Sequence, residues 1–357
     1  MSYYTVVIYI KTICLCMIVK DEEKVLDKCL SSIAGIVDEI IIVDTGSKDN
    51  TIEISKKYTH KIYNFKWIDD FSKARNYSLS KATCDYILWL DADDYLDEDS
   101  IDKLTNLKKS LNDKIDMYYF LYEFNKEYEP FYRERLFKNN GKYNFVGKIH
   151  EAIKPIGTLS YEDIIIKQQE KEIVDVSRNL RIYQKMDKSE FSERDYYYYG
   201  KELYRNKKYK KAIVYLKKFL SFKNIYNEDA IDACYTLYLI YIITSNNINP
   251  TEYLFKSFNY DLPRANILCE LGNFYLNNNE VDKAIYYFNL ALTCNNNKKG
   301  FVLKDYFGYI PLLQLCVCYD KLAMYDKAYE CNELANKIKN NEMIYEHNKK
   351  YLKSKLK

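Results

Sequence analysis

The first half of the sequence alternates between short apolar runs and segments with helical periodicity. Apolar runs bounded by charged residues lie at positions 13–19, 39–44 and 85–90. Between the first two runs, apolar residues recur at helical spacing from Val25 to Ile33, and a second helical segment follows the turn at Gly46. A further short strand is expected at 61–65. Strands that alternate with helices predict a parallel sheet of βαβ units with both faces covered.

The second half of the sequence is helical in pattern from about residue 190 onward. A short Lys-Ala element recurs in it, at 211–212, 283–284 and 327–328. Small residues at fixed offsets let paired helices approach closely, and the pattern resembles tetratricopeptide repeats at irregular spacing. Stacked helix pairs form a concave surface, so we expect either a binding surface for a peptide, a partner or a second copy of the chain, as in a homodimer, or a support for the first half.

Three carboxylates follow the last apolar run of the first half, at Asp91, Asp93 and Asp94. Ligands of open α/β sheets bind at the carboxyl ends of the strands, so a site is expected here. Carboxylates this close repel one another unless a cation lies between them. Asp91 and Asp93 are the hard oxygen ligands that Mg²⁺ and Mn²⁺ prefer. The alternative is an acidic turn in which Asp94 caps the next helix.

Carboxylates also follow the first two predicted strands, Glu22 after the first and Asp44 at the end of the second. Right-handed crossovers place these strand ends at one edge of the sheet, so we expect them to share a crevice with Asp91 and Asp93. There Asp44 can accept hydrogen bonds from a ribose or a base. A turn aspartate that binds its own backbone fits the local sequence equally well.

Three separated blocks carry a resemblance to a known family. The first block, 41–51, contains Asp44-Thr45-Gly46-Ser47. The second block, 67–76, ends in Arg75-Asn76, and the third is the Asp91-Ala92-Asp93 triplet. Together they resemble the family 2 glycosyltransferases, which have a GT-A fold and use nucleotide-diphosphate sugars. The block 67–76 is similar to a narrower group, which includes lipopolysaccharide-core glucosyltransferases and the S-glycosyltransferases of bacteriocins. Lys20-Asp21-Glu22 stands where the family more often has Tyr-Asn-Glu.

The resemblance implies a role for each matching residue. Asp44 would bind the uracil or ribose, Glu22 would support the base pocket, and Arg75 would lie over the nucleotide. Asp93 would hold Mn²⁺ or Mg²⁺ on the pyrophosphate, and Asp91 would contact the ribose or that metal, which stabilises charge on the leaving diphosphate. Arg75 also fits a surface cation at a helix start, but its apolar neighbours favour the ligand role.

A stretch similar to the same group runs from Arg133-Glu134-Arg135-Leu136-Phe137 to His150-Glu151. An inverting transfer needs a base that takes the proton of the acceptor. Glu151 is the first candidate for this base and Asp94 is the second. His150 would complete the metal shell or touch a phosphate, and the alternative is a structural histidine.

Composition narrows the classes of partner and site. The 54 Lys and Arg against 51 Asp and Glu give a net charge of +3 without a basic stripe, so no nucleic acid partner is expected. The apolar run at 3–10 is short and lacks a basic lead, so neither a signal peptide nor a membrane span is expected. The ten cysteines include no Cys-x-x-Cys pair, which favours the cytoplasm, and four of them are expected to be small buried hydrophobes: Cys14, Cys16, Cys316 and Cys318.

The sequence therefore predicts a two-domain enzyme, with an α/β GT-A nucleotide-sugar-binding catalytic domain at 1–185 and an all-α tetratricopeptide-like repeat domain at 190–357. The expected reaction is the metal-dependent, inverting transfer of a hexose or N-acetylhexosamine from a UDP-sugar to a Ser, Thr or Cys of a peptide or protein. A glycan or lipid-linked acceptor is the alternative within this chemistry. The rivals are an inactive nucleotide-sugar fold that serves as a binding module, and a nucleotidyltransferase, whose glycine-rich phosphate loop does not follow the first strand here.

Overall fold

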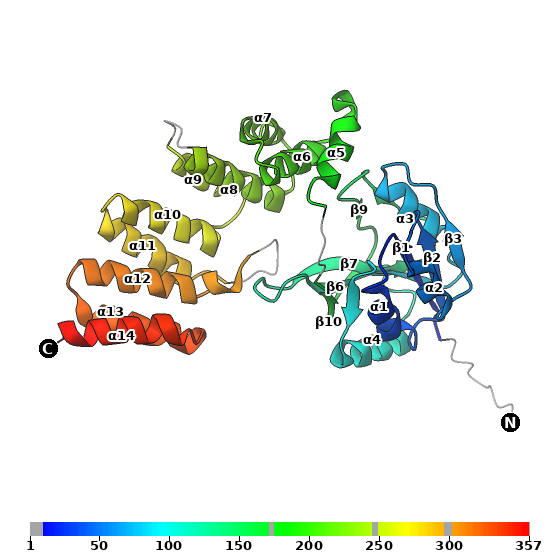
Figure 1. Cartoon of the computed structure of the whole chain (residues 1–357), viewed down its shortest axis with the longest axis horizontal. Coiled ribbons are helices and arrows are strands. Elements are labelled where there is room, and N and C mark those ends of the chain that lie inside the picture. The colour runs from blue at the N-terminus through cyan, green and yellow to red at the C-terminus, as the bar shows by residue number, and fades with distance from the viewer. Residues whose placement is uncertain (1–9, 171–174, 245–248, 296–301, 357) are drawn as a thin grey trace. The chain divides into compact units, whose positions relative to one another are not determined.

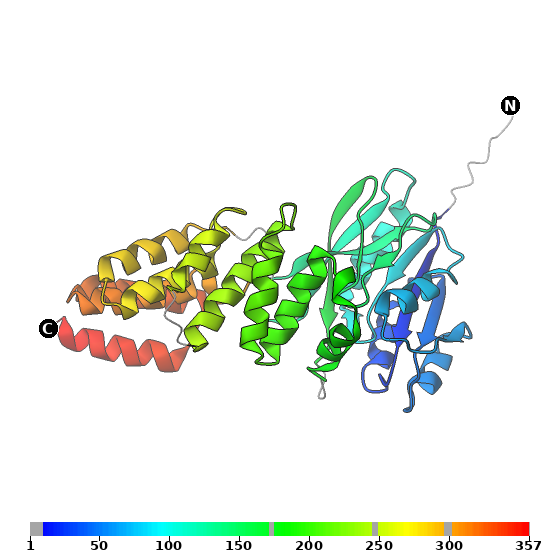
Figure 2. The same cartoon turned by 90° about the horizontal axis from the view of Figure 1, so that it is seen from above.

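The computed structural model describes residues 10–170, 175–244, 249–295 and 302–356. The chain divides into two compact units (Figures 1 and 2). The sheet unit comprises the residues up to 126 and 130–175, and the helical unit comprises 127–129 and the residues from 176 onward. Helix α5 (Arg178–Lys185) thus groups with the helical unit, although we expected it in the first domain. The functional boundaries 1–185 and 190–357 stay a prediction.

The sheet unit is built on an eight-stranded sheet with the spatial order β3-β2-β1-β4-β7-β6-β10-β5. The strands are β1 Ile13–Val19, β2 Glu39–Asp44, β3 Ile62–Asn64, β4 Tyr86–Trp89, β5 Asp94–Leu96, β6 Met117–Glu123, β7 Phe131–Lys138 and β10 Leu159–Gln168. β1 pairs in parallel with β2 and β4, and β2 pairs in parallel with β3. The predicted parallel βαβ arrangement is therefore present in the first four strands.

The second part of the sheet is mixed. β7 runs antiparallel to both β4 and β6, β10 runs parallel to β6, and β5 runs antiparallel to β10. A separate two-stranded ribbon is formed by β8 (Phe145–Val146) and β9 (Ala152–Ile153). Because β7 is inserted beside β4, its side chains reach the region where β4 ends.

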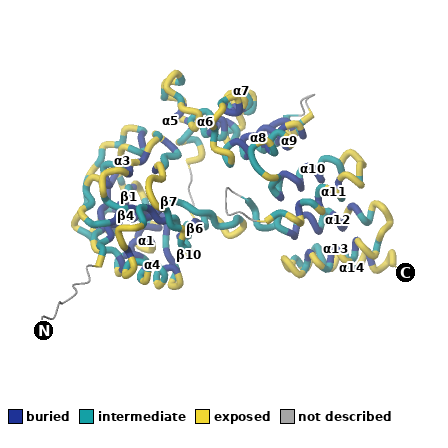
Figure 3. Tube along the Cα trace, turned by 180° about the vertical axis from the view of Figure 1, so that it is seen from behind, coloured by how far each residue is buried: buried dark blue, intermediate teal, exposed yellow. Residues whose placement is uncertain are grey.

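Helices cover both faces of this sheet: α1 Leu26–Ile33, α2 Thr51–Lys56, α3 Phe71–Leu79 and α4 Glu98–Ser110. Successive residues of a strand point to opposite faces. Leu15 and Met17 of β1 therefore share one core with α1 and α4, whereas Cys16 lies in a second core with Leu79 of α3. β1 and β4 are buried along almost their whole length (Figure 3). Two covered faces explain why both strands read as continuous apolar runs.

One predicted buried hydrophobe has a different role. Cys14 of β1 forms a disulfide with Cys84, which lies seventy residues further along the chain and just before β4. Cys14 is buried, as predicted, but the sequence did not predict its cross-link, which forms because the parallel pairing of β1 with β4 brings the two residues together. Cys16, Cys316 and Cys318 are free and buried, as predicted.

The helical unit consists of successive helix pairs. After α5 the helices are α6 Glu193–Arg205, α7 Tyr209–Phe219, α8 Asn227–Thr244, α9 Thr251–Ser257, α10 Ala265–Asn277, α11 Val281–Leu292, α12 Tyr309–Lys321, α13 Tyr325–Ile338 and α14 Glu342–Lys355. Short 3₁₀ turns lie at Lys188–Glu190 and Lys304–Tyr306.

Three of these helix pairs are connected by the same type of turn. The pairs α6–α7, α10–α11 and α12–α13 are joined by 206–208, 278–280 and 322–324, and the middle residue has a positive φ each time: Lys207 at 57°, Asn279 at 60° and Ala323 at 56°. The next N–H donates to a carbonyl near the end of the first helix, in Lys208 to Leu203, Glu280 to Tyr275 and Met324 to Tyr319, at 2.8–2.9 Å. The recurrence of this turn confirms the predicted helical-repeat architecture.

Glycine sets the closeness of the helices in two of these pairs. A Cβ on Gly272 of α10 would lie 2.6 Å from the Phe288 ring of α11, and one on Gly200 of α6 would lie 2.7 Å from Leu216 of α7. We expect Gly272→Ala to lower the free energy of unfolding by about 1–3 kcal/mol, the usual cost of overpacking, despite the better helix propensity of alanine. Urea unfolding checks this, and Gly35→Ala is the matched control, because no atom lies within 4 Å of a Cβ at Gly35. Equal stability of the two variants would contradict a glycine-dependent helix contact.

A buried carboxyl group makes the helical unit sensitive to pH. Burial raises the pKa of Asp229 in α8 to about 6; the charges of Asp232 and Glu228 add to this rise, whereas Arg194, whose Nη1 lies 3.8 Å away, and Lys201 oppose it. Because the pKa of Asp229 is higher in the folded state than in the unfolded state, its protonated carboxyl group stabilises the fold. This contribution is complete below about pH 4 and is lost as the pH rises through 6.

We expect Asp229→Asn to remove this loss and to raise the unfolding free energy at pH 7 by about 1–3 kcal/mol. Chemical unfolding of both proteins between pH 4 and 8 measures it. Identical pH profiles for the variant and the wild type would show that Asp229 ionises freely in the folded chain.

No helix within the described ranges is both long and apolar enough to cross a membrane. The apolar run at 3–10, apart from its last residue, lies outside the described residues.

Candidate active site

The three carboxylates after β4 gather at the carboxyl end of that strand. β4 ends at Trp89 and β5 begins at Asp94, so Asp91 and Asp93 lie in the turn between the two strands. One carboxylate oxygen from each of Asp91, Asp93 and Asp94 lies within 4.8 Å of the others. Asp93 and Asp94 are buried, and the Asp91 side chain is 30% exposed. Hard oxygen donors this close together match the ligand set of Mg²⁺ or Mn²⁺.

Asp94 is fixed in the interior of the turn. Its Oδ2 accepts from the Asp91 N–H at 2.9 Å and from Arg135 Nη1 at 2.7 Å, while its Oδ1 has no hydrogen-bond partner among the described residues. Burial raises the pKa of Asp94 to about 6; the charges of Asp91 and Asp93 add to this rise and Arg135 opposes it. The alternative role for Asp94 as a helix cap is not realised, because Asp97 caps α4 by accepting from the Ser100 N–H at 3.0 Å.

Arg75 of α3 connects two predicted site residues. Its Nη2 donates to Asp91 Oδ1 at 2.6 Å and its Nε donates to Glu151 Oε1 at 2.5 Å. The guanidinium carbon lies 4.8 Å from the ring centroid of Trp89 and 5.3 Å from that of Phe145, and these two rings contact each other edge to face. Burial alone would lower the pKa of Arg75, but the two carboxylates raise it above its ordinary value. Arg75 is therefore a buried, ion-paired residue and not a surface cation.

Arginines balance the negative charge of the cluster. Burial favours the protonated form of Asp91, yet the charges of Arg75, Arg135 and Arg133 together hold the pKa of its carboxyl below the ordinary value. Arg133 and Arg135 lie on β7, with their guanidinium carbons 5.0 Å and 4.2 Å from the Trp89 centroid. Asp91 is thus ionised across the physiological pH range and remains available as an anionic ligand.

Asp93 is held by the end of β10, the strand that pairs with β5. Its Oδ2 accepts from Gln168 Nε2 at 2.8 Å, and its backbone carbonyl accepts from the Gln169 N–H at 2.8 Å. Gln168 is the last residue of β10 and Gln169 follows it. In the sheet, β10 lies two strands away from β7. Sequence reasoning did not find Gln168, because β10 pairs with its neighbours only in the folded chain.

Asp44 lies at the carboxyl end of β2, opposite Val19 of β1 in the strand register. Its carboxylate accepts from the backbone N–H groups of Gly46 and Ser47 at 3.0–3.2 Å. The turn interaction that the sequence left open is therefore formed. The predicted role of the Asp44 carboxylate in the donor pocket stays a prediction.

Glu22 follows β1 at the same edge of the sheet. Its N–H donates to Thr51 Oγ1 at 2.7 Å, which ties this turn to the start of α2. The strand end is fixed in place, and the role of Glu22 in a base pocket stays a prediction.

His150 lies next to Glu151 in the chain and outside the carboxylate cluster. Its φ of 53° marks a left-handed turn immediately before Glu151, so the backbone turns sharply where Glu151 meets Arg75. His150 does not belong to the carboxylate group whose oxygens lie within 4.8 Å of one another. Its role as a metal ligand stays a prediction. His60 and His347 are exposed, as a surface role requires.

Arg135 is the main residue that sequence reasoning did not assign. It is fully buried, and its Nε and Nη2 have no hydrogen-bond partner among the described residues. The available signal was the run of three charged residues, Arg133-Glu134-Arg135, directly before the apolar pair Leu136-Phe137, since a charged residue on a buried strand needs a partner. Its partner Asp94 lies forty-one residues earlier, which this local pattern does not reveal.

The profile of Glycosyl transferase family 2 matches residues 14–213, which is more than half of the chain. The chain belongs to glycosyl transferase family 2. The match includes the whole carboxylate cluster, Arg75, Arg135 and Glu151, and it extends into α7 of the helical unit. The resemblance drawn from the sequence blocks is thereby confirmed, together with the predicted fold class.

Among its relatives, the family 2 chain is 38% identical over 142 residues to a TPR repeat-containing protein of Synechococcus elongatus, covering 39% of this chain and 34% of that protein. It is 28% identical over 271 residues to the SPbeta prophage-derived glycosyltransferase SunS of Bacillus subtilis, covering 67% of this chain and 60% of SunS. The chain thus spans less than two thirds of the length of either relative. A structure of glucosyl-3-phosphoglycerate synthase from Mycobacterium tuberculosis with Mn²⁺, UDP and phosphoglyceric acid superposes with a TM-score of 0.36 at 13% identity, covering 45% of this chain and 72% of that one.

Proposed function

We propose that this family 2 chain is a metal-dependent, inverting glycosyltransferase that moves a hexose or N-acetylhexosamine from a UDP-sugar to a peptide or protein. The observation that carries the proposal is the carboxylate cluster at the carboxyl end of β4, bridged through Arg75 to Glu151. The site combines a hard-oxygen donor set with a separate carboxylate, which are the two chemical elements that such a transfer needs.

Asp91 and Asp93 are the residues that would hold Mn²⁺ or Mg²⁺, with His150 as a further candidate ligand. The cation, when bound, supplies positive charge against the negative charge that develops on the diphosphate leaving group. Asp94 supports these two candidate ligands from the protein interior. Its Oδ2 accepts the hydrogen bond of the Asp91 N–H, and its charge is paired with that of Arg135. We infer that Asp94 positions the turn, since its carboxyl group is fully buried.

Glu151 is the proposed base. Its carboxylate takes the proton of the acceptor hydroxyl or thiol as the acceptor atom bonds to the anomeric carbon and the bond to the diphosphate oxygen breaks, with the electron pair leaving on the diphosphate. The ion pair with Arg75 Nε holds the Glu151 carboxylate in place. A single displacement of this kind inverts the anomeric centre.

The proposed donor pocket lies at the ends of β1 and β2, where Glu22 and Asp44 are placed. Asp44 sits at the same edge of the sheet as Asp91, because β1 pairs in parallel with both β2 and β4. The peptide or protein acceptor rests on the resemblance to bacteriocin glycosyltransferases and on the stacked helix pairs, which suit an extended chain.

We expect Glu151→Gln to lower the transfer rate by about 10²–10⁴-fold, the usual contribution of a positioned base. The amide is isosteric and can still accept from Arg75 Nε, so donor binding should change little. Initial rates, together with calorimetric titration of UDP, separate the two effects. Glu53→Gln, which changes a surface carboxylate on α2 whose side chain is 68% exposed, is the matched control. A rate loss that comes only from weaker UDP binding would argue against the base.

The function is tested by mass spectrometry of a reaction that contains the purified protein, Mn²⁺, UDP- and GDP-sugars and a lysate of the native host, with Asp93→Asn as the control. A hexose or N-acetylhexosamine on one protein, absent with the variant, supports the proposal. Sugar on a glycan or lipid instead identifies the alternative acceptor. If no donor is transferred or hydrolysed, the fold is a binding module and the proposal fails.

A further inference from the structure

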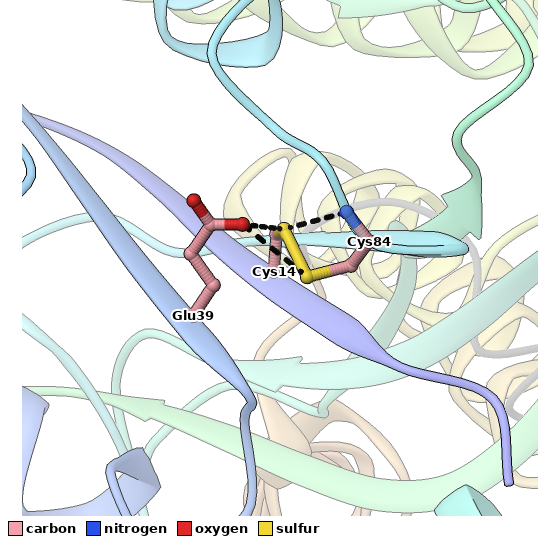
Figure 4. Close-up of side chains that lie close together, drawn as sticks. All are labelled: Cys14, Glu39 and Cys84. Atoms are coloured by element: carbon pink, nitrogen blue, oxygen red, sulfur yellow. Dashed lines mark hydrogen bonds between the residues drawn. A yellow bond between two sulfur atoms is a disulfide. The ribbon is translucent and has the colours of Figure 1, made fainter.

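A second group of metal-ligating side chains lies at the opposite edge of the sheet from the candidate active site. Cys14 stands near the amino end of β1, Glu39 opens β2, and Cys84 lies two residues before the start of β4. The register places Cys14 opposite Glu39, and the donor atoms of the three residues lie within 4.8 Å of one another (Figure 4). The group therefore joins the beginnings of three adjacent parallel strands.

The carboxylate of Glu39 is aimed at both sulfur atoms. Its Oε2 lies 2.8 Å from Sγ of Cys14 and 3.5 Å from Sγ of Cys84 (Figure 4). Thr83 Oγ1 donates to the same oxygen at 2.7 Å, and Lys61 pairs with Oε1. Burial alone would raise the pKa of Glu39, but the hydrogen bonds from Lys61 and Thr83 outweigh it and lower the pKa. Glu39 is thus a fixed, ionised carboxylate, held by partners of the kind that orient metal ligands.

The group is reached from solvent through a groove. This groove has a volume of about 580 Å³ and is lined in part by Glu39, Cys84, Asp38 and His60. In the dithiol state the two sulfurs and one carboxylate oxygen form a mixed S₂O donor set beside it. Two thiolates next to a carboxylate repel one another, and a divalent cation removes this repulsion. Sulfur donors select thiophilic cations over Mg²⁺ and Mn²⁺.

We propose that Cys14, Cys84 and Glu39, when the two cysteines are reduced, bind a thiophilic divalent cation of the zinc class. Glu39 and Cys84 line the groove, so water can reach the fourth position of a tetrahedral shell from there. The disulfide and the metal-bound dithiolate are mutually exclusive states of the same residues. The site is separate from the transferase reaction and does not depend on the proposed function.

Interconversion of the two states is a two-electron thiol–disulfide exchange with a small-molecule disulfide such as oxidised glutathione. The two cysteine thiolates lose two electrons and form the Cys14–Cys84 bond, the glutathione disulfide gains them and takes up two protons to give two thiols, and the cation is released. Either state crosslinks β1 to the segment that enters β4.

The test uses Co²⁺ as a spectroscopic substitute for zinc in the full-length protein, reduced with a phosphine. We expect one equivalent of Co²⁺ to give a sulfur-to-cobalt charge-transfer band, which the all-oxygen cluster at Asp91 cannot produce. Cys14→Ser and Cys84→Ser should each reduce the band sharply. Cys294→Ser, which alters a partly exposed cysteine of the helical unit, is the matched control and should leave it unchanged.

A second variant keeps the proposal testable if a cysteine variant fails to fold. Glu39→Gln retains both thiolates, so the band should persist while the affinity for the cation falls about 10-fold or more. Oxidised glutathione should release one equivalent of the cation and lower the protein mass by two hydrogens. No band in the reduced wild type, a band that survives Cys14→Ser, or an affinity unchanged by Glu39→Gln would overturn the proposal.

Discussion

Asp93→Asn is expected to lower the transfer rate by about 10²–10³-fold or more, the loss that follows removal of one preorganised electrostatic group. Asparagine has the same shape as aspartate, and its Oδ1 can still accept the hydrogen bond that Gln168 Nε2 now makes at 2.8 Å. The backbone contact from Asp93 to Gln169 does not involve the side chain. The fold should therefore persist while one anionic ligand of the carboxylate cluster is lost.

The measurement compares initial rates over a series of Mn²⁺ concentrations with urea unfolding of the same proteins. Asp99→Asn on α4 is the matched control, because its side chain is 68% exposed and pairs with Lys103 at the surface. We expect the control to keep both rate and stability. Full activity in Asp93→Asn would rule out the metal site, and a stability loss that matches the rate loss would show that Asp93 acts through the fold.

Arg135→Met is expected to lower the free energy of unfolding by about 3–5 kcal/mol, the cost of leaving a buried charge without its partner. Arg135 and Asp94 are both fully buried, and Arg135 Nη1 lies 2.7 Å from Asp94 Oδ2. Methionine fills part of the space but leaves the Asp94 carboxylate facing an apolar side chain. The turn that presents Asp91 and Asp93 should loosen as a result, because Asp94 Oδ2 holds its backbone.

The double variant Arg135→Met/Asp94→Asn separates charge from packing. Removal of both charges should recover about half or more of the lost stability, since a buried ion pair can be replaced by neutral groups at little cost. Arg133→Met is the matched control on the same strand; it loses a stacked but less buried cation, at an expected cost of about 0.5–1 kcal/mol. Urea unfolding of the four proteins measures these differences. No recovery in the double variant would show that Arg135 stabilises by packing alone.

The sequence by itself determined the first strands of the sheet, and it predicted where the candidate site lies. The continuous apolar runs of β1, β2 and β4 are a direct consequence of burial on both faces, so they could be identified without the fold. The handedness of βαβ crossovers then placed the residues after these strands at one edge, including Asp44 and Asp91. The recurring Lys-Ala elements likewise predicted the helix pairs, because a small residue marks each close contact.

The tertiary structure alone decided which residues complete these features. The insertion of β7 beside β4 supplies Arg135 to Asp94, and the position of β10 supplies Gln168 to Asp93. Strand order depends on packing across the whole sheet, and no local periodicity records it. The same holds for Cys14 and Cys84, seventy residues apart, which meet because β1 and β4 pair in parallel. Local sequence specifies which face of an element is buried, whereas long-range pairing specifies which charges and thiols that burial brings together.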